Sequence, residues 1–190
     1  MALFDDRATQ PRRGPGDIFK WKVLRKSDPR GDDYSAFIGA QAEIVPDLMA
    51  WLRRPVTKIL AVADAPLPTQ LLPEARAHFA CRAEVTVSHP EFLEFLAPRV
   101  SKGEAVRWLA RRLGIPLEQT MAIGDQFNDL EMIEGVGHGV AMPSAPPEVQ
   151  AAARYLAPPL AVEGAAQVIE ALVLPGVDGA VNAAHFLRRP

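Results

Sequence analysis

Residues 120–129 read Thr-Met-Ala-Ile-Gly-Asp-Gln-Phe-Asn-Asp, and this stretch decides the fold class. It opens with a short apolar run that ends in Gly124-Asp125, which is typical of a buried strand of a parallel sheet. Asp125 is therefore expected at the carboxyl end of that strand, where open α/β sheets bind their ligands. Apolar side chains return at helical spacing over residues 126–134, so a helix is predicted to follow the strand.

Two carboxylates, Asp125 and Asp129, are expected at this edge of the sheet. Asp129 falls in the first turn of the following helix, where the helix dipole favours a negative charge. Carboxylates that converge on one crevice repel each other unless a cation lies between them. A few hard oxygen ligands, with room for waters and phosphate oxygens, are what Mg²⁺ prefers. The alternative interpretation is an N-cap aspartate beside a solvated one.

Lys102 lies at the start of a second predicted helix, over residues 103–113, which Gly114 is expected to end. The helix is predicted to be amphipathic, with its apolar residues on one face: Val106, Leu109, Ala110 and Leu113. A lysine at a helix start opposes the dipole, although Glu104 compensates in part. This indicates a functional demand, such as an anion held by an ammonium group and backbone N–H groups. A solvated surface lysine is the alternative.

The C-terminal half of the chain alternates predicted helices and strands. Residues 99–174 are predicted as helix, strand, helix, strand, helix, strand, helix, which is the order of a parallel α/β sheet. Residues 15–98 are predicted as an α+β segment, with strands near 18–25, 57–63 and 84–88 and helices near 43–53 and 68–79. Residues 1–14 are expected to be a disordered leader and residues 175–190 a loose tail.

Lys102 and Asp125, separated by one helix and one strand, resemble the haloacid dehalogenase (HAD) superfamily of phosphatases, in particular its Cof-type branch. The resemblance runs from about Val56 to Leu172 and includes Ser101-Lys102-Gly103, Gly124-Asp125, Asn128-Asp129 and Gly139-Val140-Ala141-Met142. It implies an α/β fold: a partial Rossmann-like, HAD-type parallel-sheet core over residues 99–174. Residues 15–98 would form an α+β cap segment.

The resemblance also implies roles for four residues. Lys102 would be catalytic and neutralise the transferred phosphoryl group, and Asn128 would hydrogen-bond near Lys102 or the phosphate. Asp125 would bind Mg²⁺, and Asp129 would support the metal site. The implied reaction is the Mg²⁺-dependent hydrolysis of small phosphate monoesters, for example sugar phosphates.

The same family needs a nucleophilic aspartate, with a second aspartate two residues later, at the end of an early strand. No such pair is found. Asp64 follows a plausible strand, but Asp64-Ala65-Pro66 lacks the second carboxylate. The chain is therefore expected to lack the nucleophile half of the core and to expose an apolar sheet edge. Two alternatives remain: a catalytically inactive phosphate- or Mg²⁺-binding module, or one half of a split phosphatase completed by another chain or a second copy.

Composition narrows the remaining classes of protein. The net charge of −2 carries no signature of polyanion binding, so no nucleic-acid partner is expected. Cys81 is the only cysteine, which excludes an intrachain disulfide, fits a reducing compartment and predicts a buried core position. No apolar run of 18 residues and no signal peptide is found, so no membrane partner and a cytoplasmic location are expected.

Overall fold

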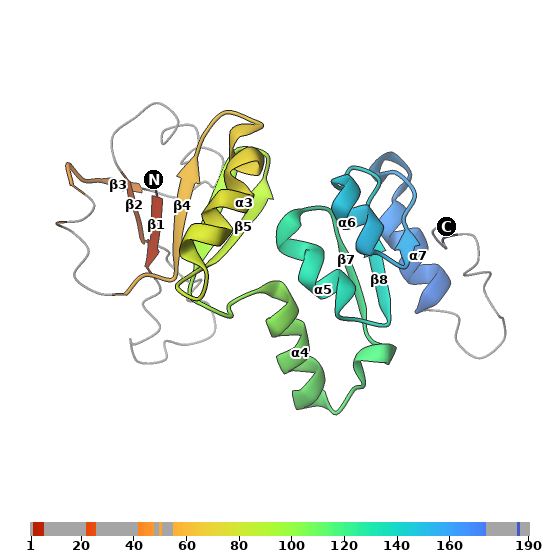
Figure 1. Cartoon of the computed structure of the whole chain (residues 1–190). Helices are drawn as coiled ribbons and strands as arrows, with labels where there is room; N and C mark the ends of the chain where they lie inside the picture. The colour runs from red at the N-terminus through yellow and green to blue at the C-terminus, as the bar shows by residue number, and fades with distance from the viewer. Residues whose placement is uncertain are drawn as a thin grey trace. The chain divides into compact units, whose positions relative to one another are not determined.

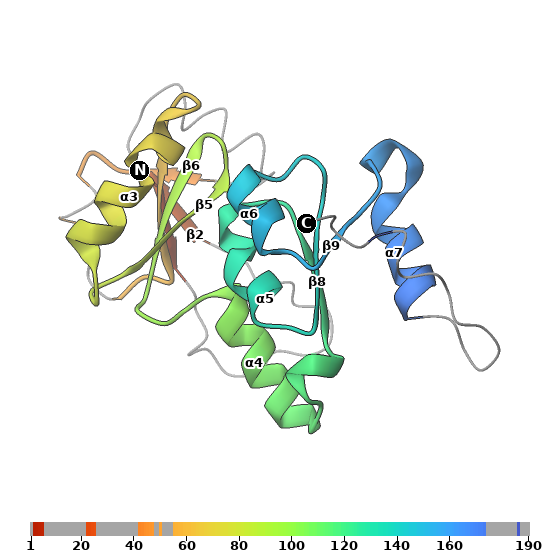
Figure 2. The same ribbon diagram turned by 45° about the vertical axis from the view of Figure 1, so that its right-hand side comes forward.

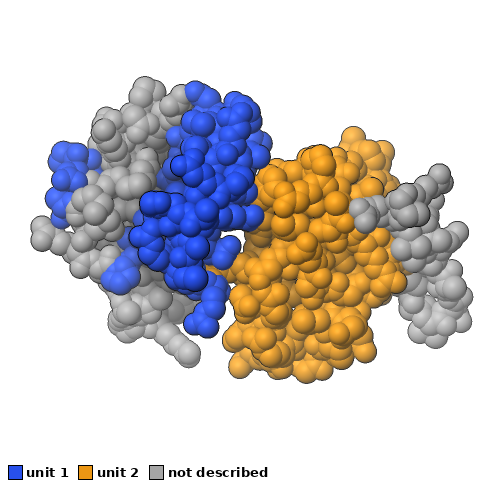
Figure 3. Space-filling view, in the orientation of Figure 1, with its two compact units in different colours: residues 1–99 blue, residues 100–190 orange. Residues whose placement is uncertain are grey.

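The computed structural model describes residues 2–5, 22–25, 42–47, 50, 55–173 and 186. The chain divides into two compact units, residues 1–99 and residues 100–190 (Figure 3). Each unit has its own sheet (Figure 1). Among the described residues, none of the helices has the length and hydrophobicity needed to cross a lipid bilayer.

Unit 1 contains a six-stranded sheet in the order β3-β2-β1-β4-β6-β5. Its strands are β1 (Ala2–Asp5), β2 (Lys22–Arg25), β3 (Ala42–Ile44), β4 (Lys58–Val62), β5 (Glu84–His89) and β6 (Phe92–Leu96). All neighbouring strands pair antiparallel except β2 and β3, which are parallel. Helix α3 (Leu67–Phe79) packs on β5 and β6 (Figure 2), and its Phe79 ring lies 5.2 Å from the Phe95 ring. Among the described residues, a mainly antiparallel sheet with α3 on one face fits the α+β segment that was predicted.

Three local predictions in unit 1 were wrong. Residues 2–5, placed in a disordered leader, form β1, because pairing with β2 on one side and β4 on the other fixes even a short strand. Residues 43 and 44, placed at the start of a helix, belong to β3, where pairing with β2 overrides the local helical pattern. Residues 45–47 are not helical and residue 50 is, while residues 48, 49 and 51–53 of the predicted helix lie outside the described residues, as do residues 6–14. Cys81 is exposed rather than buried, because it lies in the turn after α3 with a φ of 63°.

Unit 2 contains three parallel strands in the order β7-β8-β9. They are β7 (Met121–Gly124), β8 (His138–Ala141) and β9 (Tyr155–Leu156). The α-helices are α4 (Lys102–Leu113), α5 (Leu130–Glu134), α6 (Pro147–Ala152) and α7 (Gly164–Leu172). Short 3-10 turns are η1 (Leu117–Gln119), η2 (Phe127–Asp129) and η3 (Leu160–Val162). This order confirms the predicted alternation of helices and parallel strands, and with it the α/β fold class.

The core of unit 2 consists of two clusters, because successive residues of β8 point to opposite faces of the sheet. One cluster is Ile133, Ala141, Ala145, Val149 and Ala153. The other is Val140, Tyr155, Ala157, Val168 and Phe186. Phe186 lies in the predicted loose tail, yet it is buried and its carbonyl accepts a hydrogen bond from the Leu156 N–H at 2.9 Å. That part of the tail is therefore packed, while residues 174–185 and 187–190 lie outside the described ones.

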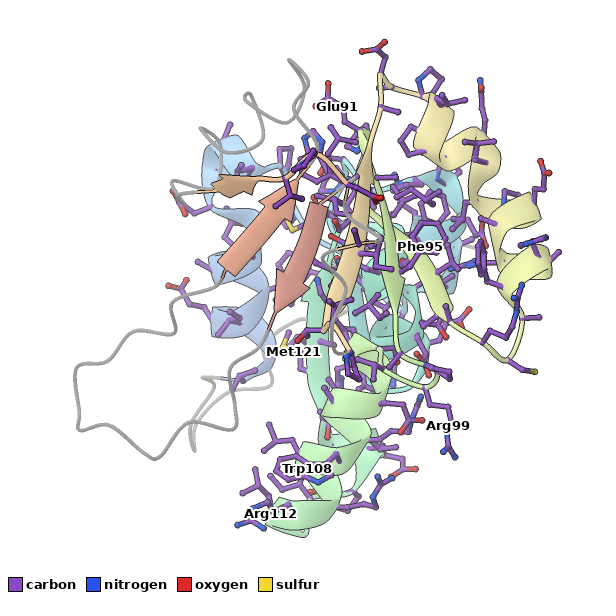
Figure 4. The ribbon with its side chains drawn as sticks, turned by 90° about the vertical axis from the view of Figure 1, so that its left-hand side faces the viewer. Glu91, Phe95, Arg99, Trp108, Arg112 and Met121 are labelled. Atoms are coloured by element: carbon purple, nitrogen blue, oxygen red, sulfur yellow. The ribbon has the colours of Figure 1, made fainter. Side chains whose placement is uncertain are left out.

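Helix α4 has the predicted end, but much of its apolar face is exposed. It begins at Lys102 and ends at Gly114, whose left-handed φ of 69° fits the predicted glycine stop. However, only Gly103 and Ala110 are buried, whereas Leu109 and Leu113 are 49% and 60% exposed. Trp108 and Arg112 also extend from this helix (Figure 4). The predicted apolar face is therefore buried only in part, with Ala110 buried and Val106 half-buried, because the main contacts of α4 are with α5 and η2.

Candidate functional site

The turn after β7 is built around the Asp129 carboxylate. Its Oδ2 accepts hydrogen bonds from the backbone N–H groups of Asp125 at 2.9 Å and Gln126 at 3.1 Å. Asp129 is only 3% exposed, so it is not the solvated aspartate of the alternative interpretation. It closes the turn by satisfying N–H groups that precede the helix and otherwise lack partners.

Gly124 lets this carboxylate approach the end of β7. A Cβ atom at position 124 would collide with the Cβ of Asp129 and lie 2.5 Å from its Cγ. Real Cβ atoms do not approach other atoms so closely, so a side chain at position 124 would push Asp129 away. The Gly124-Asp125 pair seen in the sequence therefore has a steric reason as well as a chemical one.

Lys102 reaches the same carboxylate from the first turn of α4. The helix start is fixed by Ser101, whose Oγ accepts the Glu104 N–H at 3.0 Å. The Lys102 Nζ donates to Asp129 Oδ1 at 2.5 Å. The lysine side chain is 50% exposed and the aspartate side chain 4%, so a half-exposed lysine pairs with a buried carboxylate. A buried carboxylate needs such partners, because its desolvation is otherwise costly.

Two acceptor groups of the turn are left uncommitted. The Asp125 carboxylate is partly exposed and makes no hydrogen bond or ion pair with the described residues. Asn128 Oδ1 is buried and has no hydrogen-bond partner within the described part of the chain. Both oxygens of Asp129 are already engaged, so the free ligands of this site are the oxygens of Asp125 and Asn128.

Oxygen atoms of this type are the ligands that Mg²⁺ prefers. Mg²⁺ is commonly held by one or two carboxylates, with waters and phosphate oxygens completing an octahedron. The residues that the structure describes contain no group of three or more His, Cys, Asp or Glu side chains arranged for a metal. The Asp125 carboxylate and the unpartnered Asn128 oxygen, three residues apart in the same turn, are therefore the groups that could hold such an ion, with water and phosphate oxygens as further ligands.

A second ionic cluster joins α4 to α5. Arg107 donates to Glu104 Oε1 from Nε at 3.1 Å and from Nη2 at 2.9 Å. Its Nη2 also donates to Glu131 Oε1 in α5. The hydrogen bond to Glu131 is the largest influence on the pKa of Arg107, which is raised above its ordinary value against the opposing effect of desolvation. The Glu104 contact lies within α4, whereas the Glu131 contact depends on the fold.

The predicted site residues all lie in unit 2: Lys102, Asp125, Asn128 and Asp129. The structure joins Lys102 to Asp129, and Asp129 to the backbone of Asp125, whereas Asn128 Oδ1 has no hydrogen-bond partner, Lys102 included, among the described residues. Asp64, the nearest substitute for a nucleophile, is an exposed turn residue after β4 in the unit 1 sheet. Sequence reasoning missed Arg107 and Glu131, because neither belongs to the motifs that it used.

Residues 28–169 match the family model of the haloacid dehalogenase-like hydrolases. The chain therefore belongs to this family, as its residues predicted. A crystal structure of a haloacid dehalogenase-like hydrolase from Bacteroides thetaiotaomicron has a TM-score of 0.63 to this chain and 27% sequence identity, covering 89% of this chain and 59% of that one.

The curated relatives that the chain matches include named phosphatases. The HMP-PP phosphatase of Cronobacter sakazakii is 33% identical over 129 residues, which is 68% of this chain and 47% of that protein. A 5-amino-6-(5-phospho-D-ribitylamino)uracil phosphatase of Bacillus subtilis is 33% identical over 113 residues, covering 60% of this chain and 45% of the relative. The chain thus spans about half the length of the curated relatives that it matches.

Proposed function

We propose that the chain carries the lysine and metal part of a Mg²⁺-dependent phosphatase site that acts on small phosphate monoesters, such as sugar phosphates. The observation that carries this proposal is the 2.5 Å contact between Lys102 Nζ and the buried Asp129 Oδ1, beside the uncommitted Asp125 carboxylate. The phosphatase names of two relatives support the same reaction class. The Cof-type branch and a cytoplasmic location remain predictions, as does the lack of nucleic-acid and membrane partners.

Each residue has a role that its surroundings favour. The half-exposed Lys102 ammonium can bind phosphate oxygens while Asp129 keeps it aimed at the end of β7. Asp125 and Asn128 would hold Mg²⁺, which when bound neutralises charge on the phosphate. Asp129 would support the metal site by fixing the turn rather than by giving up an oxygen, since both of its oxygens are engaged. These residues bind and orient a phosphate; a nucleophile has to come from elsewhere.

The test is release of phosphate from p-nitrophenyl phosphate by the purified chain with and without Mg²⁺. If the chain turns over alone, release should depend on Mg²⁺ and Asp125→Asn should lower it about a hundredfold, because a metal-binding charge is lost. Asp64→Asn is the matched control, since it makes the same change at an exposed turn of unit 1, and it should retain the wild-type rate. Metal-independent release, or an Asp125→Asn variant as active as the wild type, would contradict the proposal.

A second candidate is one half of a split phosphatase, and the edge of the unit 2 sheet favours it. The carbonyls of Thr120 and Gly124 accept hydrogen bonds from β8, at 3.1 and 2.9 Å. Because backbone groups alternate along a strand, those of Met121 and Ile123 face the opposite edge, where no described strand pairs with β7. An unpaired edge invites a strand from another chain or a second copy. Turnover only in the presence of a complementing polypeptide would establish this candidate.

The third alternative is a catalytically inactive binding module. It would bind Mg²⁺ and phosphate through Lys102 and Asp125 without turnover, alone or in a mixture. Isothermal titration with Mg²⁺ and inorganic phosphate measures that binding directly. Binding that Asp125→Asn abolishes, together with no turnover under any condition, would favour the module over both enzymes.

A further inference from the structure

Helix α4 carries Lys102 but buries little apolar side-chain surface. Its buried residues are Gly103 and Ala110, whose side chains are absent or small, and its large apolar side chains Leu109 and Leu113 are exposed. Apolar burial stabilises packing in proportion to area, so these two positions contribute little. The position of the first turns of α4 therefore depends on its polar contacts with α5.

Glu131 of α5 lies between two residues of α4. A Cβ atom at Gly103 would be 2.6 Å from Glu131 Cγ and 2.9 Å from Glu131 Cβ, so the glutamate side chain runs directly against Gly103. Its carboxylate accepts a hydrogen bond from Arg107, one helical turn further along α4. Glu131 is thus held at Gly103 by contact and at Arg107 by charge, and Gly103 is the residue next to Lys102.

The guanidinium group of Arg107 contacts more than one residue. Its Nη1 lies 3.3 Å from where a Cβ of Gly135 would be, so the guanidinium group rests against the end of α5. Glu104 holds the same group from within α4. A lone exposed ion pair contributes little stability. This planar group, only 25% exposed and fixed on two helices, instead specifies a geometry.

We propose that Arg107 is a positioning residue that, through Glu131, fixes the first turns of α4 on α5 and thereby holds the Lys102 ammonium on Asp129. The covalent layout supports this, because Lys102 begins α4 and Asp129 directly precedes α5. The spacing of the two helices therefore sets the distance between Lys102 Nζ and Asp129 Oδ1. The inference rests on the proposed function for its importance to phosphate binding, but not for its geometry.

The geometry is tested by limited labelling of lysines in the full chain with an amine-reactive reagent, read by mass spectrometry. Arg107→Gln should raise labelling of Lys102 about threefold to tenfold, the size expected when a coupled contact is lost. Arg107→Lys keeps the charge but loses the planar group that contacts two helices, so it should fall between the wild type and Arg107→Gln, and Glu131→Gln should reproduce Arg107→Gln. Lys58, paired with Glu94 at 2.9 Å in unit 1, is the internal reference and should not change.

Arg111→Gln is the matched control, since it removes the same charge from an exposed position one turn further along α4. It should leave the labelling of Lys102 unchanged. Equal labelling of Lys102 in the wild type and in Arg107→Gln would overturn the proposal. So would an increase at Lys58 as large as that at Lys102, because that would mean general loosening.

The consequence for the site is tested by titrating inorganic phosphate in the presence of Mg²⁺. Arg107→Gln should weaken phosphate binding about threefold to tenfold in the wild-type background and not at all in a Lys102→Gln background. An equal loss in both backgrounds would show that Arg107 does not act through Lys102 and would overturn the proposal. A wild-type chain that binds no phosphate would refute the proposed function instead, while the labelling still decides the positioning role.

Discussion

The two carboxylate oxygens of Asp129 make different contacts. Its Oδ2 accepts the N–H groups of Asp125 and Gln126, and its Oδ1 accepts the Lys102 ammonium. Asp125, four residues earlier, makes none of these bonds with its side chain. Two aspartates of one motif therefore differ in physical role: one is committed to the turn, and the other is available to a ligand.

This difference predicts different effects on stability. Asp129→Asn should lower the free energy of unfolding by about 1–3 kcal/mol, because a buried acceptor of three donors loses its charge and part of its accepting capacity. Asp125→Asn is the matched change and should stay within about 0.5 kcal/mol of the wild type, as for an uncommitted surface group. Urea unfolding measures both values. Equal losses in the two variants would contradict the assignment of roles.

At the scale of elements, α4 is a well-formed helix with an uncovered face. Ser101 caps its start and Gly114 its end, so local signals fix its length. Leu109 and Leu113 of its predicted apolar face are exposed. Burial of exposed apolar side chains is favourable, so such a face invites association.

The uncovered face predicts self-association at high concentration. Leu113→Gln should raise the dissociation constant about tenfold, because burial of one leucine contributes roughly 1.5–3 kcal/mol. Leu160→Gln is the matched control, because Leu160 is 77% exposed on η3 and should leave association unchanged. Light scattering over a range of concentrations measures the effect. A chain that stays monomeric throughout would refute the prediction.

At the scale of the whole molecule, the chain spans about half of the relatives that it matches, and all four candidate site residues lie in unit 2. The unit 2 sheet has an edge strand, β7, that no described strand covers. The site lies at the carboxyl end of that strand. What pairs with β7 therefore determines which further groups reach Lys102 and Asp125.

A complementing polypeptide should restore turnover if the chain is one half of an enzyme. In that case a polypeptide encoded immediately upstream should give Mg²⁺-dependent phosphate release when mixed with this chain, although neither would release phosphate alone. Ile123→Pro should abolish this restoration, because proline removes the outward N–H that a new strand would bind. The control is Ile169→Gln on the exposed side of α7, which should have no effect. Val140→Pro would not serve as a control, because β8 is the central strand of the sheet. Equal turnover with and without the added polypeptide would refute the split enzyme.

The sequence by itself determined the alternation of helices and parallel strands in residues 99–174, the ends of α4, and the family. These features rest on spacing and end signals that act over a few neighbouring residues. Only the tertiary structure decided that Asp129 is buried, that Arg107 binds Glu131, that residues 2–5 form a strand and that Leu113 is exposed. The reason is physical: burial and pairing depend on groups that are distant in sequence, and local periodicity does not specify which distant groups meet.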